Sequence, residues 1–425
     1  MITAKAFADK RYAVFGLART GLSVVAALRG SGAQVVAWDD NEAARAGIED
    51  VQVSLVDLNT ADLSSFDALV VSPGVPLNTH PLAKRAAEAG VPVIGDVELF
   101  ALARPELPPH KVVGITGTNG KSTTTALIHH LLVTAGIPAR LGGNIGLPVL
   151  GQEALPAGGV YVLELSSFQI DLTRSLDCDV VVVLNITPDH LDRYADFDGY
   201  AASKARLLTM QSAGVAIISD ESAASRALAD AHPQALRISV SDIDDQSAWP
   251  TLQGPHNAEN VAVACAAALH LGALPAAIAE GLKTYPGLPH RMERVATKRG
   301  VLYVNDSKAT NPTSTAPALA AYPTIHWICG GRNKTEELDA CLPYVGHVKA
   351  AYTIGEAEEL FAKLLEPFVP VRRTRTVANA IRLAAEAAKP GEVVLLSPAC
   401  ASYDQFKDFE ARGAAFREAV GGLPS

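Results

Sequence analysis

The sequence lacks the features that mark nucleic-acid-binding, membrane and disulfide-rich proteins. Its formal net charge is −9, and no run of lysine and arginine is dense enough for a nucleic-acid surface. No apolar stretch approaches the length of a membrane span, and residues 1–11 carry no apolar core of a secretory signal. The five cysteines are scattered without a CxxC pair, which argues against a zinc site or a disulfide framework. We therefore expect a cytoplasmic protein that has neither nucleic acid nor a membrane as a partner, and we separately expect a monomer.

What the sequence does contain is the composition of a globular chain. Hydrophobic residues make up 48% and charged residues 19% of its 425 positions. At roughly 150 residues per domain, this length suggests about three domains. Short apolar runs, such as 112–115, 161–165 and 180–184, are mostly near-continuous rather than alternating. Continuous runs of this length are typical of strands buried on both faces, so the sequence predicts parallel α/β sheets.

Two proline-rich segments, 104–110 and 285–291, predict where domains meet. They divide the chain into three α/β domains at about 1–106, 107–286 and 287–425. We expect Rossmann-like first and third domains and a central P-loop-type ATPase domain with a parallel sheet. The elements expected in the third domain are strands Leu302–Asn305, His326–Cys329, Ala351–Ile354 and Val393–Leu396, a helix Val377–Ala388 and a last helix near Asp404–Val420.

A glycine-rich loop with a lysine carries the strongest chemical signal. The segment Gly117-Thr-Asn-Gly-Lys-Ser-Thr123 follows an apolar run and precedes an apolar helical stretch. Glycines let backbone N–H groups turn toward phosphate oxygens, Lys121 can reach terminal phosphates, and Ser122 can hold magnesium. The strict G-x-x-x-x-G-K-[ST] spacing is not met, because position 115 is isoleucine. The strand before and the helix after the loop still predict an ATP site, the alternative being a plain turn with an exposed lysine.

A second glycine turn lies near the N-terminus. Gly16-Leu-Ala-Arg-Thr-Gly21 follows one apolar run, and Asp39 ends the next. This turn is a variant of the dinucleotide fingerprint, in which an acidic residue at the second strand's end contacts a ribose hydroxyl. Ser72-Pro-Gly74 ends a later strand on the same expected sheet edge, so the two loops could share one diphosphate-bearing ligand. The alternatives are an unliganded turn with a solvated Asp39, or the NAD site of an oxidoreductase, which would leave the phosphate loop unexplained.

A carboxylate and a histidine follow two further apolar runs. Glu164 lies near the end of the run 160–165, and His190 follows the run 180–184. A carboxylate beyond a buried strand near a phosphate loop is a standard way to place Mg²⁺. Taken singly, His190 could be a helix-start or core histidine, and Asp189 and Asp192 could be helix N-terminal charges. Taken together, the residues predict a metal site.

Three polar segments occur later in the chain. Asn257 enters an alanine-rich helical stretch, where it could be only a helix cap. The cluster Asn305–Asn311 directly follows a buried strand, a position that is typical of sites in α/β sheets. Ser397–Ser402 ends the last apolar run, and its alternative is a loop and helix cap with Phe406 and Phe409 in the core.

Together these motifs resemble the Mur ligases, over essentially the whole chain. The resemblance rests on Gly117–Thr123, Leu163–Gln169, Asp189–Tyr194, Gly287–Arg291, Asn305–Asn311 and Ser397–Phe409. The phosphate loop is shared with folylpolyglutamate synthases, whereas the last two segments resemble the branch that adds D-glutamate. The resemblance implies an ATP-dependent ligation in cytoplasmic peptidoglycan precursor synthesis. ATP would convert the carboxylate of UDP-N-acetylmuramoyl-L-alanine to an acyl phosphate, which the amine of D-glutamate attacks.

The resemblance also implies roles for individual residues. Those implied in catalysis are Lys121, Glu164, His190, Lys204 and Lys308. Those implied at two Mg²⁺ sites are Ser122, Glu164, His190 and Lys204, the last as a carbamate, because a plain ammonium would repel the metal. Those implied at ATP are Gly117, Thr118, Asn119, Gly120, Lys121, Ser122, Thr123, Asn257, Asn260, Arg291, Asp306 and Lys308. Those implied at the UDP-sugar are Arg19, Thr20, Asp39, Ser72, Gly74, Asn144 and His190. Those implied at D-glutamate are Thr310, Lys334, Ser402, Tyr403 and Phe409.

The chain departs from the family pattern in two places. Relatives often carry an acidic residue between the twin glycine and the lysine, where this chain has Gly330-Gly-Arg-Asn-Lys334. Relatives also often place a basic residue soon after the first-domain aspartate, where this chain has Asp40-Asn41.

Two alternatives remain: a folylpolyglutamate synthase, which would lack the first domain, and a non-catalytic nucleotide-binding regulator, which would not need Lys204 or Lys308. The sequence does not distinguish D- from L-glutamate.

Overall fold

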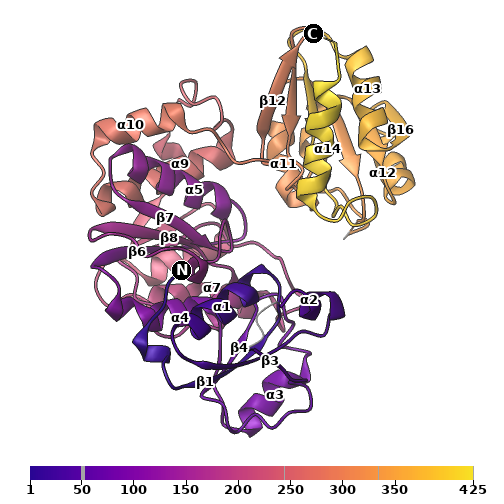
Figure 1. Ribbon diagram of the computed structural model, residues 1–425. Coiled ribbons are helices and arrows are strands. Elements are labelled where there is room, and N and C mark those ends of the chain that lie inside the picture. The colour runs from indigo at the N-terminus through magenta and orange to yellow at the C-terminus, as the bar shows by residue number, and fades with distance from the viewer. Residues whose placement is uncertain (49–52, 244, 334, 425) are drawn as a thin grey trace. The chain divides into compact units, whose positions relative to one another are not determined.

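The computed structural model describes residues 1–48, 53–243, 245–333 and 335–424. Within these residues the strands form three sheets with helices packed against them (Figure 1). The chain forms two compact units. Residues 1–242 with 259–282 contain the first two sheets, and residues 243–258 with 283–425 contain the third. No helix of the described residues is long and apolar enough to cross a membrane.

The first sheet is parallel, in the order β3-β2-β1-β4-β5. Its elements are η1 (Lys5–Phe7), β1 (Arg11–Phe15), α1 (Arg19–Gly30), β2 (Gln34–Trp38), α2 (Glu42–Ala46), β3 (Ser54–Leu55), β4 (Ala68–Val71), α3 (Pro81–Glu88), β5 (Val93–Ile94), α4 (Asp96–Ala103) and η2 (Arg104–Glu106). Val14 packs in one core with Leu28 of α1, while Phe15 packs with Leu82 of α3 on the other face. The strand order reverses between β1 and β4, which is where ligands bind in such sheets.

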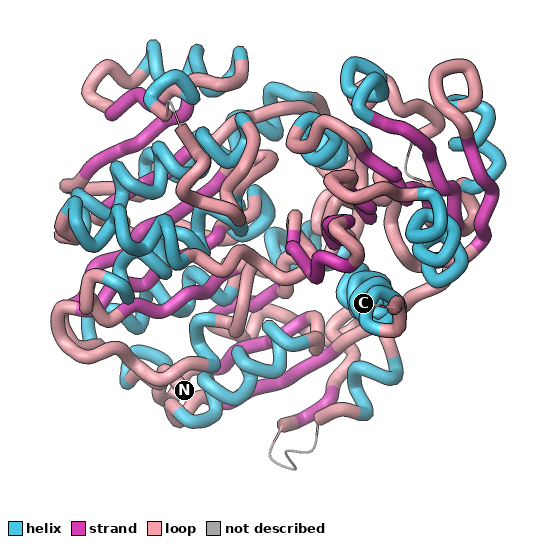
Figure 2. Tube along the Cα trace, turned by 90° about the horizontal axis from the view of Figure 1, so that it is seen from above, coloured by secondary structure: helices cyan, strands magenta, loops and turns pink. Residues whose placement is uncertain are grey.

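The second sheet is also parallel, in the order β11-β10-β9-β6-β8-β7. Its strands are β6 (His110–Thr116), β7 (Ala139–Gly143), β8 (Gly159–Glu164), β9 (Val180–Val183), β10 (Val215–Ser219) and β11 (Leu236–Ile238). Its helices are α5 (Lys121–Thr134), η3 (Val149–Gly151), α6 (Ser167–Asp171), α7 (Phe197–Ala205), η4 (Arg206–Thr209), α8 (Ala223–Ala231), η5 (Val240–Asp242), α9 (Pro255–Leu271) and α10 (Pro275–Thr284). Figure 2 shows strands of the chain lying among helices, as expected from continuous apolar strands. Because β6 lies between β8 and β9, the segments after these strands meet at one sheet edge.

The third sheet has the order β12-β13-β17-β14-β15-β16. Its elements are β12 (Glu293–Lys298), β13 (Val301–Asn305), α11 (Pro312–Ala320), β14 (Ile325–Gly330), η6 (Leu342–His347), β15 (Val348–Ile354), α12 (Glu358–Leu365), β16 (Val371–Arg375), α13 (Val377–Ala387), β17 (Val393–Leu396) and α14 (Phe409–Gly421). Leu319 of α11 and Phe361 of α12 pack in the core on one face. Ile381 of α13 and Phe416 of α14 pack on the other, so helices cover both faces.

Two predictions for the third domain are wrong. The third sheet is not wholly parallel, because β12 pairs with β13 in the antiparallel direction. The two-residue turn between them, Arg299-Gly300, has φ of 51° and 74°, the positive values that such a hairpin requires. The last helix begins at Phe409 rather than near Asp404, because the Asp408 side chain accepts a hydrogen bond from Ala411 N at 2.7 Å and caps it.

Candidate functional site

Two glycines shape the loop between β6 and α5. Gly117 has φ of 149°, and a Cβ there would lie 2.6 Å from Leu184 Cβ. Gly120 has φ of 84°, and a Cβ there would lie 2.3 Å from the Asn260 side-chain oxygen. No side chain fits either position without displacing its neighbour. The loop therefore brings bare backbone, and the first N–H groups of α5, to the sheet edge where an anion can bind.

Asparagine side chains brace this loop from outside it. The Asn185 Oδ1 atom, after β9, accepts a hydrogen bond from Asn119 N at 3.1 Å. The Asn185 amide donates to Glu259 Oε2 at 3.0 Å. The Asn260 Oδ1 atom accepts from Thr124 Oγ1 at 3.0 Å. Sequence reasoning missed Asn185 and Glu259, because their partners lie 66 and 74 residues away along the chain.

Two lysines converge on one carbonyl of the loop. Lys121 Nζ donates to Gly117 O at 3.0 Å and to Thr118 O at 2.8 Å. Lys204 Nζ, from α7, donates to the same Gly117 O at 2.7 Å and lies 4.5 Å from the ring centre of Tyr200. Only 2% of Lys204 is exposed. Burial, and then the nearby charge of Lys121, lower the pKa of Lys204 well below its ordinary value, which favours its neutral amine form.

Glu164 ends β8 beside this loop. It is 2% exposed, and its Oε1 accepts a hydrogen bond from Asn144 Nδ2 at 3.0 Å. Among the described residues, its Oε2 has no hydrogen-bond partner. Asn144 N also donates to Glu164 O at 2.8 Å, an approach that Gly143 permits with its φ of 84°. A buried carboxylate oxygen without a donor is costly unless a cation is close to it.

His190 lies in a turn after β9, not in a helix or the core. Its φ is 52°, and its carbonyl accepts a hydrogen bond from Arg193 N at 2.9 Å. Both alternatives for His190 are therefore wrong, and Asp189 and Asp192 do not begin a helix, since α7 starts at Phe197. Burial lowers the pKa of His190, and the charges of Lys121 and Lys204 lower it further against the opposing effect of Asp189.

The residues at this edge fit a magnesium ion. No group of three His, Cys, Asp or Glu side chains within the described ranges could enclose a metal alone. Magnesium, however, is usually held by one or two carboxylates together with water and phosphate oxygens. Glu164 offers a buried carboxylate oxygen that lacks a donor, and Ser122 lies in the first turn of α5. The donor set is therefore of the kind that Mg²⁺ takes beside a nucleotide.

The first sheet brings its predicted loops together at the strand-order reversal. Ser72 Oγ donates to Gly16 O at 2.9 Å, and a Cβ on Gly16 would lie 2.7 Å from Ser72 Cβ. Asp39 is not simply solvated, because it accepts hydrogen bonds from Leu17 N at 2.6 Å and Asn41 N at 2.8 Å. Arg19 and Thr20 begin α1, and the position of Gly74 has open space around it. Asn144, assigned to the same ligand, instead contacts Glu164 in the second sheet.

A basic residue does follow Asp40-Asn41, four positions further along the chain. Arg45, in α2, donates to the carbonyl of Asp39 at 2.6 Å and lies 4.4 Å from the ring centre of Trp38. Asp40 itself accepts from Asn59 Nδ2 at 2.8 Å. The guanidinium of Arg45 therefore borders the Asp39 loop, and the basic residue six positions after Asp39 is its signal in the sequence.

In the second unit, a buried carboxylate follows β13. Asp306 is 4% exposed, and its oxygens accept hydrogen bonds from Ser397 Oγ at 2.7 Å and Met292 N at 3.2 Å. Burial raises the pKa of Asp306 to about 7, although Ser397 and the charge of Arg291 act in the other direction. Lys308 N donates to His290 O at 2.9 Å, and Lys308 Nζ lies 3.9 Å from the ring centre of Phe409. Asp306, Lys308 and the segment 290–292 therefore form one cluster.

The other predicted residues of this unit are less uniform. Ser402 is buried and Thr310 half-buried, whereas Tyr403 is 66% exposed. Phe409 is not in the core, since its ring makes a cation–π contact with Lys308, whereas Phe406 does pack against the core. Asn257 lies inside α9, with its amide donating to Gln253 O at 2.9 Å. Lys334 lies outside the described residues.

Arg412 is a residue of this region that sequence reasoning missed. It is 1% exposed and donates to Ser307 Oγ, Ser307 O, Cys400 O and Ala401 O at 2.9 to 3.1 Å. It thereby ties the loop after β13 to the loop after β17. Arg332, at the family departure, pairs through its backbone with Ala401 and through its side chain with Glu356 at 3.1 Å.

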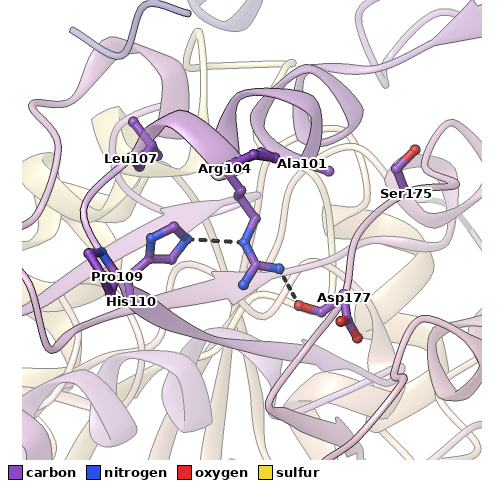
Figure 3. Close-up of a pocket in the computed structure, with 8 residues that line it drawn as sticks. Ala101, Arg104, Leu107, Pro109, His110, Ser175 and Asp177 are labelled. Atoms are coloured by element: carbon purple, nitrogen blue, oxygen red, sulfur yellow. Dashed lines mark hydrogen bonds between the residues drawn. The ribbon is translucent and has the colours of Figure 1, made fainter.

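A separate cavity of about 450 Å³ lies at the opposite end of β6, around the first proline-rich segment (Figure 3). There Arg104 Nε donates to His110 Nε2 at 3.0 Å, and Arg104 Nη1 donates to the carbonyl of Asp177. These bonds join the two ends of the segment to each other and to the approach to β9. The cavity is therefore part of the joint between the first two sheets rather than of the phosphate loop.

Three family models match the chain in order. They are the Mur ligase MurD-like N-terminal domain at residues 10–95, the Mur ligase middle domain at 115–251, and the Mur ligase glutamate ligase domain at 290–400. Two relatives named UDP-N-acetylmuramoylalanine--D-glutamate ligase match over the full length. The one from Novosphingobium aromaticivorans is 58% identical and covers 100% of this chain and 97% of that protein. The one from Sphingopyxis alaskensis is 57% identical and covers 100% of both.

The chain belongs to the Mur ligase family. Solved Mur ligase structures share its fold at low identity. UDP-N-acetylmuramate-alanine ligase from Thermotoga maritima gives a TM-score of 0.61 at 15% identity, covering 97% of this chain and 99% of that one. MurF ligase from Thermotoga maritima in complex with ADP gives 0.63 at 16%, covering 99% and 97%. The three α/β sheets are thus those of the three Mur ligase domains.

Proposed function

We propose that this Mur ligase joins D-glutamate to UDP-N-acetylmuramoyl-L-alanine at the expense of ATP. The observation that carries the proposal is the edge of the second sheet, where Lys121 and Lys204 reach one loop carbonyl beside the orphaned oxygen of Glu164. An edge of this kind suits phosphoryl transfer, because cations must offset the repulsion between anionic groups. The names of the full-length relatives support the two substrates to be joined.

The chemistry proposed is activation of a carboxylate by phosphorylation. The acceptor carboxylate attacks the γ-phosphorus of ATP, the bond to ADP breaks, and an acyl phosphate forms. The amine of D-glutamate then attacks the acyl carbon, and the tetrahedral adduct releases phosphate and a proton as the amide forms. Lys121 would hold the transferring phosphoryl group, and the N–H groups at the start of α5 would orient its oxygens.

Magnesium would be held at two positions by Ser122, Glu164, His190 and Lys204. When bound, it would neutralise charge that develops between the phosphates. Lys204 would serve as a carbamate, formed when its neutral amine adds CO₂ and loses a proton. The burial of this amine and the lowered pKa of Lys204 support that step, because only the neutral form is a nucleophile.

The remaining contacts are assigned by the grouping of the loops. The ATP phosphates would lie on Gly117–Thr123, and Asn257, Asn260, Arg291, Asp306 and Lys308 would contact the rest of the nucleotide. The UDP-sugar would lie on Arg19, Thr20, Asp39, Ser72 and Gly74, with Asn144 and His190 at its reactive end. D-Glutamate would meet Thr310, Lys334, Ser402, Tyr403 and Phe409. We further propose domain boundaries near 106 and 286, a monomer, and action in the cytoplasm.

Phosphate release tests this proposal. With ATP, UDP-N-acetylmuramoyl-L-alanine and D-glutamate all present, release should be rapid, and omission of any one should abolish it. D-Alanine, which lacks the side-chain carboxylate, should not replace D-glutamate, because a site built for a charged group rejects analogues without it. Equal rates with L-glutamate, or release that needs no acceptor, would contradict the assignment. A folate acceptor in place of the UDP-sugar provides the control for a folylpolyglutamate synthase.

A further inference from the structure

A strap of two hydrogen bonds joins the first-sheet loop after β4 to the turn that carries His190. Arg193 Nη2 donates to Val75 O at 2.8 Å. Asn78 Nδ2 donates to Asp192 O at 2.9 Å, in the reverse direction. Each side thus supplies one side-chain donor and one backbone acceptor to the other. The two bonds link positions 118 and 114 residues apart in the sequence.

Phe168, at the start of α6, packs against Arg193 of this strap and against His190. The guanidinium of Arg193 lies 4.1 Å from the Phe168 ring centre, within the range of a cation–π contact. The His190 ring lies 5.1 Å from the same ring centre, edge to face. Arg193 N also closes the turn by donating to His190 O at 2.9 Å. Arg193 and His190 therefore share one support, and a shift of either side chain changes the packing of the other.

The strap continues toward the lysine of α7. Tyr194 stacks on Phe168 with ring centres 6.1 Å apart, and its hydroxyl donates to Asp171 Oδ2 at 2.8 Å. Asp171 Oδ1 accepts from Ser203 Oγ at 2.8 Å, and Ser203 precedes Lys204. A continuous chain of contacts thus runs from the loop after β4 to the phosphate-loop edge.

We infer that Arg193 is a positioning residue that fixes the acceptor-binding loop against the His190 turn, so that the acceptor carboxylate is presented to the phosphate loop. This inference rests on the proposed function, which places the UDP-sugar on Ser72 and Gly74 and the phosphoryl transfer at Lys121. Val75 directly follows Gly74, so a bond to its carbonyl restrains the loop at the sugar nucleotide. Arg193 touches neither reacting atom; it acts through the backbone of that loop and through Phe168.

The chain offers a matched control on the same surface. Arg193 and Arg174 both line one cavity of about 310 Å³ beside the strap. The side chain of Arg174 makes no hydrogen bond or ion pair with the described residues, and only its backbone N–H is used, by Glu98 Oε2 at 2.6 Å. Arg174→Met therefore removes the same charge from the same cavity without removing a strap contact.

The test is steady-state kinetics of Arg193→Met, Arg193→Lys, Asn78→Ala and Arg174→Met, with each substrate varied in turn. Losing a charged hydrogen bond to a carbonyl together with a cation–π contact should lower kcat/KM for the UDP-sugar by about ten- to a hundredfold. The KM for ATP should change less than about twofold, because the phosphate loop keeps its own contacts. Arg193→Lys retains a donor and a cation and should recover part of the loss. Asn78→Ala, which removes only the second bond, should show a weaker effect of the same kind.

The outcomes separate this inference from the proposed function. If wild type requires all three substrates but Arg193→Met matches Arg174→Met for the UDP-sugar, the strap has no positioning role and the ligase assignment stands. A uniform loss for all three substrates, parallel to a fall in melting temperature, would also overturn the inference, since a purely structural residue predicts that result. Should Arg193→Met fail to fold, Asn78→Ala and Arg193→Lys decide the question by the same ratio of KM values. A wild type that needs no acceptor would refute the proposed function itself.

Discussion

Gly120→Ala should destabilise the phosphate loop by more than the cost of backbone strain alone. Gly120 has φ of 84°, and a Cβ there would lie 2.3 Å from Asn260 Oδ1, roughly 1 Å closer than van der Waals contact allows. The left-handed conformation costs a non-glycine residue about 1–2 kcal/mol. Moving Asn260 aside would also break its buried hydrogen bond from Thr124 Oγ1, which adds about 1–3 kcal/mol.

Gly136→Ala, after the other end of the same helix, isolates the first contribution, the backbone strain. Gly136 has φ of 76°, but a Cβ there would have nothing within 4 Å. It should therefore carry the strain without the clash. At about 2–4 °C per kcal/mol, Gly136→Ala should lower the melting temperature by a few degrees and leave the kinetics unchanged.

Thermal unfolding and phosphate release, with ATP varied, compare the two variants. Gly120→Ala should lower kcat/KM for ATP by about a hundredfold, because a displacement of about 1 Å in a transferring group's support costs that much. If both variants have the same kcat/KM for ATP and the same melting temperature, the close approach of Asn260 to the loop has no functional weight, and the reasoning fails.

Three further predictions concern the lysines and the buried aspartate. Lys204→Ala should be nearly inactive, and added short carboxylates should restore part of the rate by supplying the missing anionic oxygen; wild-type activity without a carboxylate would contradict this. Lys334→Ala should raise the KM for D-glutamate much more than that for ATP, as measured by varying each substrate, and unchanged glutamate kinetics would remove Lys334 from the site. Burial raises the pKa of Asp306 from 3.8 to about 7, so its ionisation opposes folding. The associated stability is complete below about pH 4 and is lost as the pH rises through about 7. Asp306→Asn should flatten this part of the curve of melting temperature against pH, and an unchanged curve would show that Asp306 does not titrate there.

Local signals in the sequence predicted most of the fold. The run Val180–Val183 and its counterparts are continuous because helices cover both sheet faces, so strand identity could be inferred from composition alone. The hairpin of β12 was missed because Glu293–Lys298 is polar and half-exposed, and reads as a loop. Its Arg299-Gly300 turn was the available signal. The start of α14 was misplaced because Asp404 and Asp408 are equally good caps in sequence.

The candidate site was predictable to the extent that its residues follow strands. Glu164 and the phosphate loop are adjacent because β6 and β8 pair, with Ile115 opposite Glu164. The bond from Lys204 to Gly117 O spans 87 residues, and no spacing rule indicates it, so its role came from resemblance alone. Arg193, Arg412 and Asn185 act by contacting backbone atoms of distant loops. Such partners have no side-chain signature in the sequence, which explains why these residues were not found.

The burial of the cysteine thiols makes the opening of each unit separately measurable. Among the described residues the five cysteines form no disulfide; Cys178 is buried in the first unit, and Cys329 and Cys341 are buried in the second. Burial raises the pKa of Cys178 and of Cys341 to about 12, so in the closed state almost none of either is the reactive thiolate. A thiol reagent can therefore modify them only when the surrounding core opens. The labelling rate at Cys178 then reports the free energy of opening of the first unit, which contains the phosphate loop. The labelling rate at Cys341 reports the free energy of opening of the second unit, and neither measurement needs an engineered probe.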